Sequence, residues 1–363
     1  MPDVNLSFDW HLPVAVRFGA GCSDGLAAAL GDRPAVVLAF EPARALGLFA
    51  RWKAQWGSRL RAWVDVPDGL ASLALGRELA TEVWPALEQH PCTVLIGVGG
   101  GSTLDLAKLL RCRPADGSFQ ALAAAIRGQA PWPALLPAPL WLLPTTAGTG
   151  SEVTRWATLW DTDTAPAVKR SFDETFGWAE RAFVDPLLTL SVPRAVTRDS
   201  ALDTLSHALE AIWNRNANPV SDRLAVAAAQ RVVSVLPRCL NEPGNVDLRS
   251  DLALAALQAG IAFSQTRTAL AHALSYALTL DQGVPHGLAC ALWLPTAWRL
   301  AQGRDARVDG LLREVFSGAE SLQDWLQTVG AGLRPQELGI ADAEARIAAA
   351  LVSARGRNFI GAA

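Results

Sequence analysis

Cysteine is scarce in this sequence, and its five cysteines lie far apart. Their number is odd and no CxxC pair occurs, which excludes a disulfide framework and a cysteine-based structural zinc site. Reduced thiols of this kind are typical of the cytosol. We therefore expect a cytoplasmic protein.

Long apolar runs and a dominant charge are absent as well. No segment has the roughly 18 consecutive apolar residues that a membrane-spanning helix needs, and the opening MPDVNLSFDW lacks the basic stretch and apolar run of a signal peptide. The formal net charge is only -3, so no polyanion-binding surface is indicated. We expect neither a membrane nor nucleic acid as a partner.

The spacing of apolar residues changes about halfway along the chain. A chain of 363 residues is longer than most domains with a single hydrophobic core, so two domains are expected. The first half alternates short β-rich runs with helical stretches, which predicts an α/β domain with a mostly parallel sheet. The second half has apolar residues at three- and four-residue spacing, which predicts an all-helical domain. We place these domains at residues 1–190 and 191–363.

The expected elements follow from these patterns and from proline and glycine breaks such as Pro237. Strands are predicted at 14–18, 35–40, 61–66, 93–98 and 140–143, with helices at 72–89 and 102–112. Helices of the second half are predicted at 196–213, 219–237, 248–280, 287–300, 305–316, 319–328 and 341–354.

A glycine-rich turn follows one predicted strand. In VLIGVGGGSTLDLAK, Gly99, Gly100 and Gly101 stand between an apolar strand and an amphipathic helix. Glycines let a diphosphate approach the backbone, the helix start offers N–H groups, and Ser102 can cap the helix. The turn predicts a dinucleotide site, although it is neither GxGxxG nor a P-loop, and such turns also occur for packing alone.

A second turn strengthens this prediction. In PTTAGTGSE, small and hydroxyl-rich residues including Thr145, Thr146 and Thr149 follow another apolar strand. Hydroxyls after a strand are often only turn chemistry. Two such turns at the carboxyl ends of strands in one sheet favour a shared dinucleotide ligand.

Three histidines and one aspartate have a spacing that can build a metal site. Asp203 and His207 are four residues apart, so on a helix they share one face. His272 and His286 would lie about 21 Å apart along an unbroken helix, but the glycine and proline just before His286 let the chain fold back. This donor set suits Fe(II) or Zn(II).

A single buried histidine is commonly an ordinary core residue, whereas Asp-x-x-x-His on one helix turn favours a ligand role. His11, in a polar segment, and His90, at the junction of a loop and a strand, receive no functional role.

Several motifs together resemble a known family. GGGSTLDLAK, PTTAGTGSEVT, VDP at 184–186, DTLSHALE and VPHGLACALWLP are similar to the successive motifs of the iron-containing (group III) alcohol dehydrogenases. They run in the family's order from about residue 94 to 300, and FGAG at 18–21 resembles the family's first turn.

The resemblance implies a dinucleotide-binding α/β domain with a mostly parallel sheet, followed by an all-α metal-binding domain, as in dehydroquinate synthase. It implies an NAD- or NADP-dependent alcohol dehydrogenase acting on a small aldehyde or alcohol, and we expect a homodimer. Iron(II) is the expected metal, with zinc(II) as the alternative. By position, the implied metal ligands are Asp203, His207, His272 and His286, and the implied cofactor-binding residues are Gly99, Gly100, Gly101, Ser102, Asp105, Thr145, Thr146 and Thr149.

One position departs from the family pattern. Many members carry a histidine where this chain has Tyr276, which we regard as a candidate for relaying a proton, for shaping the nicotinamide pocket, or for simple helix packing. The segment around it resembles the phosphonoacetaldehyde reductase or 2-hydroxyethylphosphonate dehydrogenase branch. Such a substrate is anionic, and Arg267 and Arg155 are the candidates to bind it.

The sequence is compatible with either NAD or NADP and with two rival functions. Glu41, after the strand at 35–40, would favour NAD over NADP if it binds the adenosine ribose. The rivals are a lyase that resembles dehydroquinate synthase and a non-catalytic protein that binds nucleotide or metal.

Overall fold

The chain divides into two compact units. The computed structural model describes residues 7–362 except 166, 339 and 341. We call Pro13–Thr146 together with Ser151–Leu188 the sheet unit. Ala147–Gly150 and the chain from Thr189 onward form the helical unit, which also includes the described residues up to Leu12. Two short segments that precede residue 190 thus group with the helices.

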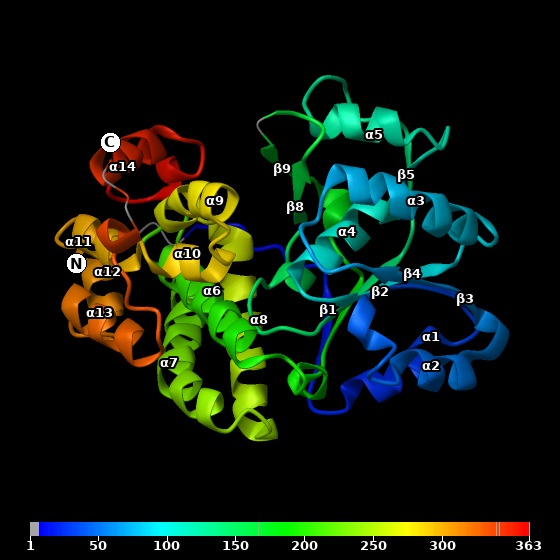
Figure 1. Ribbon diagram of the computed structural model, residues 1–363, viewed down its shortest axis with the longest axis horizontal. Helices are drawn as coiled ribbons and strands as arrows, with labels where there is room; N and C mark the ends of the chain where they lie inside the picture. The colour runs from blue at the N-terminus through cyan, green and yellow to red at the C-terminus, as the bar shows by residue number, and fades with distance from the viewer. Residues whose placement is uncertain (1–6, 166, 339, 341, 363) are drawn as a thin grey trace. The chain divides into compact units, whose positions relative to one another are not determined.

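Six parallel strands form the centre of the sheet unit, in the order β1-β10-β7-β4-β2-β3. Every residue of β4 is buried, because helices cover both faces of the sheet. Figure 1 shows α1 and α2 on one side and α3 and α4 on the other. The strands are β1 Ala15–Phe18, β2 Ala35–Phe40, β3 Leu60–Val66, β4 Val94–Gly99, β7 Leu140–Pro144 and β10 Arg181–Val184.

The other elements of this unit flank the sheet. The helices are α1 Leu26–Leu30, α2 Leu48–Trp56, α3 Leu73–Glu88, α4 Gly101–Arg111 and α5 Phe119–Ile126. Two antiparallel pairs stand apart from the main sheet: β5 Cys112–Pro114 with β6 Leu135–Pro137, and β8 Trp156–Asp161 with β9 Val168–Asp173.

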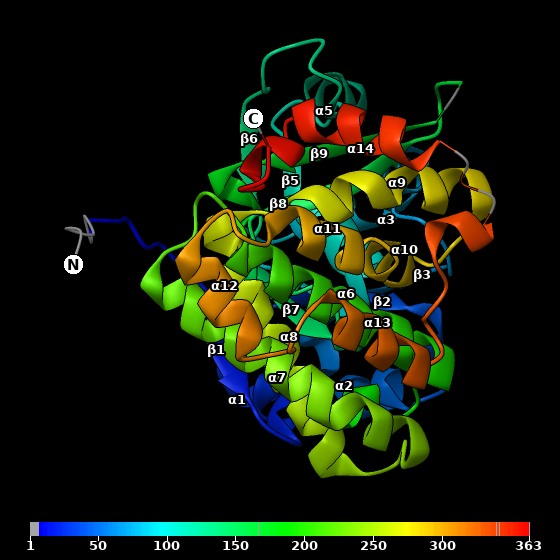
Figure 2. The ribbon, with the colours of Figure 1, turned by 90° about the vertical axis from the view of Figure 1, so that its left-hand side faces the viewer.

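Long helices form the core of the helical unit. In Figure 2, α6, α7 and α8 lie side by side, and α9 and α10 pack on α6. The helices are α6 Arg194–Ile212, α7 Pro219–Asn241, α8 Val246–Thr266, α9 Leu270–Gln282, α10 His286–Ala291, α11 Leu294–Ala301, α12 Ala306–Arg313, α13 Ala319–Thr328 and α14 Ala343–Val352.

The predicted fold class is confirmed, and the five predicted strands are present, but three details were wrong. The helix predicted at 248–280 is two helices, because Arg267 adopts a positive φ of 71° and ends α8. The helix predicted to end at Pro237 continues to Asn241, since Cys239 and Leu240 pack into the core. The helix predicted at 287–300 is also divided, into α10 and α11.

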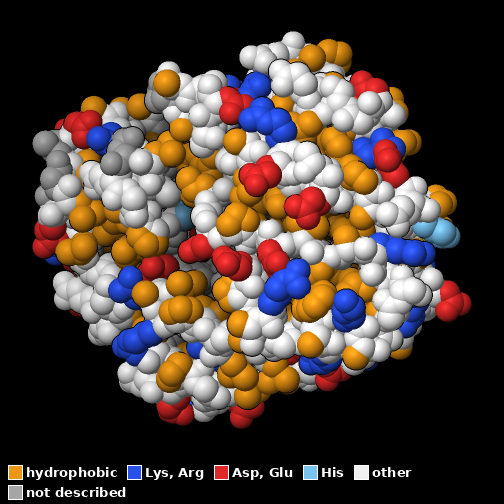
Figure 3. Space-filling model, turned by 45° about the vertical axis from the view of Figure 1, so that its right-hand side comes forward, with side chains coloured by type: hydrophobic (Ala, Val, Ile, Leu, Met, Phe, Trp, Pro, Cys, Tyr) orange, Lys and Arg blue, Asp and Glu red, His pale blue; other side chains and the backbone are white. Residues whose placement is uncertain are grey.

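Two further observations concern the helices and one face of the surface. In the described part of the chain, no helix combines the length and apolarity needed to cross a membrane. On the face that Figure 3 shows, basic and acidic side chains are interspersed and do not gather into one basic patch.

Candidate metal and cofactor sites

Four side chains with metal-binding atoms meet in the helical unit. Asp203 and His207 lie one turn apart on α6, His272 lies on α9, and His286 is the first residue of α10. The Nε2 atoms of His207, His272 and His286 lie 3.8, 3.4 and 3.9 Å from Oδ1 of Asp203. The structure thus brings all four predicted metal ligands around one carboxylate oxygen.

The burial of these atoms fits a cation. Among the described residues, neither Oδ1 of Asp203 nor Nε2 of His272 has a hydrogen-bond partner, and both are buried. Such atoms cost free energy unless a ligand satisfies them. Burial lowers the pKa of His207 to about 4, although Asp203 opposes this shift, so the ring is neutral at pH 7. A neutral imidazole is the form that binds iron or zinc.

Glu210, which the sequence analysis did not identify, orients His272. It is fully buried on α6, and its Oε2 accepts a hydrogen bond of 2.7 Å from Nδ1 of His272. Because this hydrogen bond holds a proton on Nδ1, Nε2, which faces Asp203, is the nitrogen available to a metal. Glu210 also accepts hydrogen bonds from the backbone N–H groups of Ala269 and Ala271 at the start of α9. Its position three residues after His207 on the same helix is the feature of the sequence that could have indicated this role.

A glycine allows α10 to approach α6. A Cβ atom on Gly287 would lie 1.9 Å from the backbone oxygen of Asp199 and 3.0 Å from Cβ of Asp203. Any larger residue would displace α10, and His286 with it. The glycine in VPHGLACALWLP therefore has a packing role at the metal site.

Cys290 contributes a fifth donor atom that sequence reasoning missed. Its Sγ lies 3.8 Å from Nε2 of His286. Four ligand atoms lie within 4.8 Å of one another, one each from Asp203, His272, His286 and Cys290. From the sequence, Cys290 was predicted to be only a reduced thiol, although it lies one helical turn after His286.

Tyr276 lies beside this cluster. Its ring stacks on that of His286, with centroids 6.3 Å apart and an interplanar angle of 14°. Burial raises the pKa of its phenol, an effect that the nearby Arg355 charge opposes. The position is compatible with a role at the metal site, and the proton relay stays a prediction.

In the sheet unit, the glycine turn and the start of the threonine segment are neighbours. Strand β4 pairs with β7, Gly99 lies opposite Pro144, and the N–H of Thr145 donates to the carbonyl of Gly99 at 3.0 Å. Both turns are therefore at the carboxyl ends of adjacent parallel strands, where α/β sheets bind nucleotides.

The start of α4 is suited to an anion. Its N-cap is Gly100, which offers no side-chain cap, and Ser102 is exposed in the first turn, so the expectation that Ser102 caps the helix was wrong. The first N–H groups of the helix thus lack a side-chain cap, and helix N-termini of this kind bind phosphate. A Cβ atom at Gly99 would lie 2.5 Å from the side chain of Thr103, so packing also requires glycine there.

Asp105 faces the interior of the sheet unit. Its Oδ1 accepts a hydrogen bond of 2.7 Å from Ser151, and its Oδ2 accepts one of 2.8 Å from the N–H of Thr158. Lys108 is fully buried and also donates to Ser151, at 2.8 Å. This network attaches the segment after Gly150 to α4, so the contacts of Asp105 are structural, and its predicted binding to the cofactor is untested.

The middle of the threonine segment packs in the helical unit. The hydroxyl of Thr204 donates to the carbonyls of Ala147 and Gly148, both at 3.2 Å. A Cβ atom on Gly150 would lie 2.5 Å from Cα of Gly260, so α8 approaches the segment closely. Packing therefore explains part of its glycine content.

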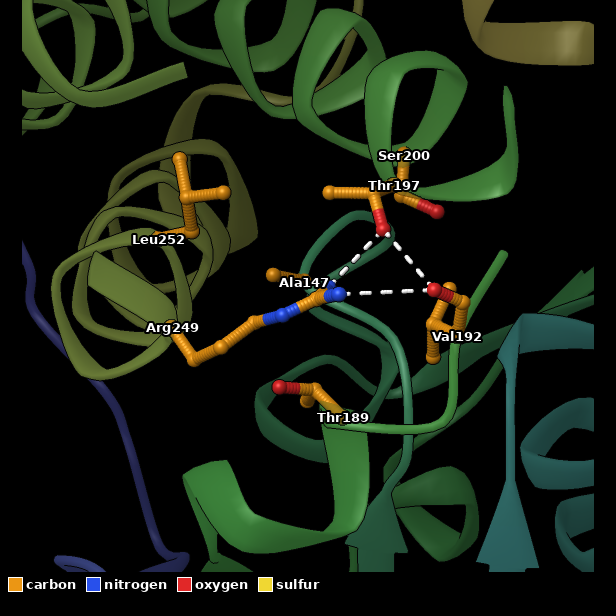
Figure 4. A pocket seen from close by; sticks show the side chains of 7 residues that line it. All are labelled: Ala147, Thr189, Val192, Thr197, Ser200, Arg249 and Leu252. Carbon is orange, nitrogen blue, oxygen red and sulfur yellow. Dashed lines mark hydrogen bonds between the residues drawn. The ribbon is translucent and has the colours of Figure 1, made fainter. Parts of the chain in front are cut away.

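A small cavity beside this segment is not a substrate site. Its volume is about 10 Å³, room for about one water molecule. Figure 4 shows Arg249 reaching into it and hydrogen-bonded to Thr197 and Val192.

The other predicted site residues lie partly in the sheet unit and partly in the helical unit. Arg155 lies in the sheet unit and forms an ion pair of 2.5 Å with Asp173. Arg267 is exposed at the end of α8 in the helical unit. Glu41 is exposed at the carboxyl end of β2, the neighbour of β4 in the sheet. The backbone N–H of His11 donates to the side chain of Gln265, and the ring of His90 accepts a hydrogen bond from the N–H of Cys92.

Comparison with known proteins gives two matches to family models, in order along the chain. Residues 13–186 match the model described as iron-containing alcohol dehydrogenase, and residues 197–355 match the C-terminal model of the same family. The chain belongs to the iron-containing alcohol dehydrogenase family. Probable alcohol dehydrogenase EutG of Escherichia coli is 31% identical over 283 residues, which cover 74% of this chain and 69% of EutG.

Other proteins are similar over different spans. Long-chain-alcohol dehydrogenase 1 of Geobacillus thermodenitrificans is 38% identical over 203 residues, 56% of this chain. The matched region spans about half the length of that relative and of several others. Sulfoacetaldehyde reductase from Bifidobacterium kashiwanohense, solved in complex with NAD+, is similar along nearly the whole fold, with a TM-score of 0.84, 26% identity and coverage of 97% of this chain and 94% of that one.

Proposed function

We propose that this protein is a metal-dependent, NAD-linked alcohol dehydrogenase that reduces a small anionic aldehyde, such as phosphonoacetaldehyde, or oxidises the corresponding alcohol. One observation carries the proposal: Asp203 and three imidazoles converge, and the buried atoms Oδ1 of Asp203 and Nε2 of His272 lack a hydrogen-bond partner among the described residues. Family membership supports the reaction class.

A divalent iron ion held by this cluster would act as a Lewis acid on the carbonyl oxygen of the aldehyde. Asp203 contributes the negative charge of the site, and His207 and His286 complete the donor set. Glu210 fixes His272 in the tautomer whose Nε2 lone pair faces the cluster. Zinc is the alternative metal, because the same donors suit it.

The nicotinamide would exchange the hydride with the substrate carbon. The N–H groups at the start of α4, beside Gly99 and Gly100, would bind the diphosphate of the dinucleotide. Glu41, at the end of the strand next to β4, would accept hydrogen bonds from the ribose and favour NAD over NADP. The structural relative solved with NAD+ supports this preference.

An anionic two-carbon aldehyde is the substrate class that we favour. The sequence around Tyr276 resembles the branch of phosphonate-linked reductases, and a similar fold belongs to a sulfoacetaldehyde reductase. Phosphonate and sulfonate share a tetrahedral oxyanion head. The homodimer and the cytoplasmic location stay predictions.

Steady-state assays of the iron-loaded protein test the proposal. Oxidation of NADH should occur with phosphonoacetaldehyde or sulfoacetaldehyde, with a higher kcat/KM than for propanal. Chelation should abolish it, and added iron should restore it. Net NADH oxidation would argue against the lyase alternative, which returns its hydride within one cycle. Absence of turnover with every aldehyde in the iron- and zinc-loaded forms would refute the proposed function.

A further inference from the structure

We propose that Arg355 binds the tetrahedral oxyanion of the substrate and that Tyr276 and Thr268 position it. This proposal rests on the proposed function and replaces Arg155 and Arg267 as the anchors. Arg155 is neutralised by Asp173, and Arg267 lies exposed at a helix end. Arg355 was not a candidate in the sequence analysis, because its place beside Tyr276 arises only from the fold.

Arg355 follows α14 and lies against α9, the helix that carries His272. Its Cζ atom is 5.2 Å from the centroid of the Tyr276 ring, and that ring stacks on His286. In Figures 1 and 2, α14 lies beside α9. The Tyr276 ring therefore contacts both the guanidinium and a predicted metal ligand.

The position of Arg355 is fixed by the break between α8 and α9. Its guanidinium donates to the hydroxyl of Thr268 at 2.8 Å, and Asn358, three residues later, donates to the carbonyl of the same residue at 2.9 Å. A Cβ atom on Gly356 would lie 1.8 Å from the backbone oxygen of Ala350, so the turn after α14 is tight. An arginine held in this way loses little side-chain entropy on binding a ligand.

The charge of Arg355 is not neutralised within the described part of the chain. Its described contacts are with Thr268 and Tyr276, and no described carboxylate forms an ion pair with it. A guanidinium has five N–H donors in a planar fork, which matches two oxygens of a phosphonate or sulfonate. A charge-assisted pair of hydrogen bonds to such a head group would be strong and specific.

The tyrosine at position 276 is suited to this role. Its ring face attracts the guanidinium through a cation–π interaction and adds no second positive charge beside it. The histidine that many family members carry there would lack the phenol ring and would repel Arg355 when protonated. Tyr276 is thus a positioning residue for the anion site.

The test compares Arg355→Met, Arg355→Lys and the control Arg357→Met, which changes an exposed arginine two residues away. Initial rates are measured with phosphonoacetaldehyde, sulfoacetaldehyde and propanal. We expect Arg355→Met to raise KM for the anionic aldehydes about 10- to 100-fold and to change the constants for propanal less than about threefold. Arg355→Lys should recover part of the loss, and Arg357→Met should resemble the wild type. The preferred oxyanion is that of the aldehyde with the higher kcat/KM in the wild type.

The positioning role is tested with Tyr276→Phe and Tyr276→Leu. The first keeps the aromatic face and should keep the wild-type KM for anionic aldehydes, even where kcat falls. The second removes the face and should raise that KM several-fold. Equal KM values for the two variants would overturn the positioning role of Tyr276.

A binding measurement separates this proposal from the proposed function. Methylphosphonate is titrated calorimetrically into the wild type and Arg355→Met, each loaded with metal and NAD. Weaker binding to the variant supports the anion site even if no aldehyde is turned over. Equal binding to both proteins, or equal losses of kcat/KM for propanal and the anionic aldehydes, would overturn it.

Discussion

Glu210 accepts a hydrogen bond of 2.7 Å from Nδ1 of His272 and so turns the other nitrogen of that ring toward Asp203. Glu210→Gln removes the charge and presents an amide NH2 where only an acceptor fits. We expect the affinity for iron or zinc to fall about 10- to 100-fold, as measured by competition with a chelating dye. Glu344→Gln, at an exposed glutamate, is the matched control. Unchanged affinity in Glu210→Gln would show that the carboxylate does not orient the ligand.

His207 and Cys290 are competing candidates for the fourth ligand. A catalytic metal site keeps a position open for substrate, which a fifth protein ligand would occupy. We therefore expect His207→Ala to lose bound metal while remaining folded by circular dichroism, and Cys290→Ser to retain it. The cobalt(II)-substituted wild type should show no sulfur-to-cobalt charge-transfer band. A band that disappears in Cys290→Ser would place the thiolate in the ligand set.

Gly287 sets the distance between α10 and α6. Gly287→Ala would bring its Cβ against the backbone oxygen of Asp199, a contact that only a shift of α10 can relieve. We expect loss of metal and destabilisation of about 1–3 kcal/mol in urea unfolding. Gly310→Ala, in α12, meets no atom within 4 Å and should be neutral or stabilising by up to about 1 kcal/mol. Full metal content in Gly287→Ala would contradict the packing role.

Lys108 should make stability depend on pH. Burial lowers its pKa from 10.5 to about 8, although Asp105 and Glu152 oppose the shift. Between these values the unfolded chain binds more protons at this site than the folded chain, so the free energy of unfolding rises with pH. The contribution to the slope is at most about 1.4 kcal/mol per pH unit.

Denaturant unfolding from pH 8 to 10 measures this slope. Lys108→Met should show a smaller rise than the wild type, whatever its absolute stability. Lys53→Met, at an exposed lysine, should keep the wild-type slope. Identical slopes in the wild type and Lys108→Met would contradict the depressed pKa.

Short-range residue patterns were sufficient to predict the strands and helices that depend on neighbouring residues alone. Strands β2 and β4 are continuous apolar runs, and β4 ends at a glycine turn, so both could be placed within a residue or two. Strand β10 was missed, because its four residues join the sheet only through pairing with β1 and β7, far away in sequence. The break at Arg267 was missed because no proline or glycine marks it.

Some residues of the candidate site could likewise be predicted from the sequence, and others could not. The spacing of Asp203 and His207 on one helix face was sufficient to propose a metal site. The chain break before His286 added His272 and His286 as ligands, and the family resemblance implied the same set. The spacing of Glu210 after His207 and of Cys290 after His286 could have suggested these two residues, but their roles depend on which helices pack together. The same is true of Arg355. Long-range packing determines these neighbours, and single-sequence periodicity carries no such information.

Anomalous X-ray diffraction at the iron edge, from crystals of the iron-loaded protein, tests the central claim most directly. We predict one strong peak within coordination distance of Oδ1 of Asp203 and of one nitrogen each of His207, His272 and His286. A peak elsewhere, or an iron-loaded crystal whose metal contacts fewer than three of these side chains, would contradict it.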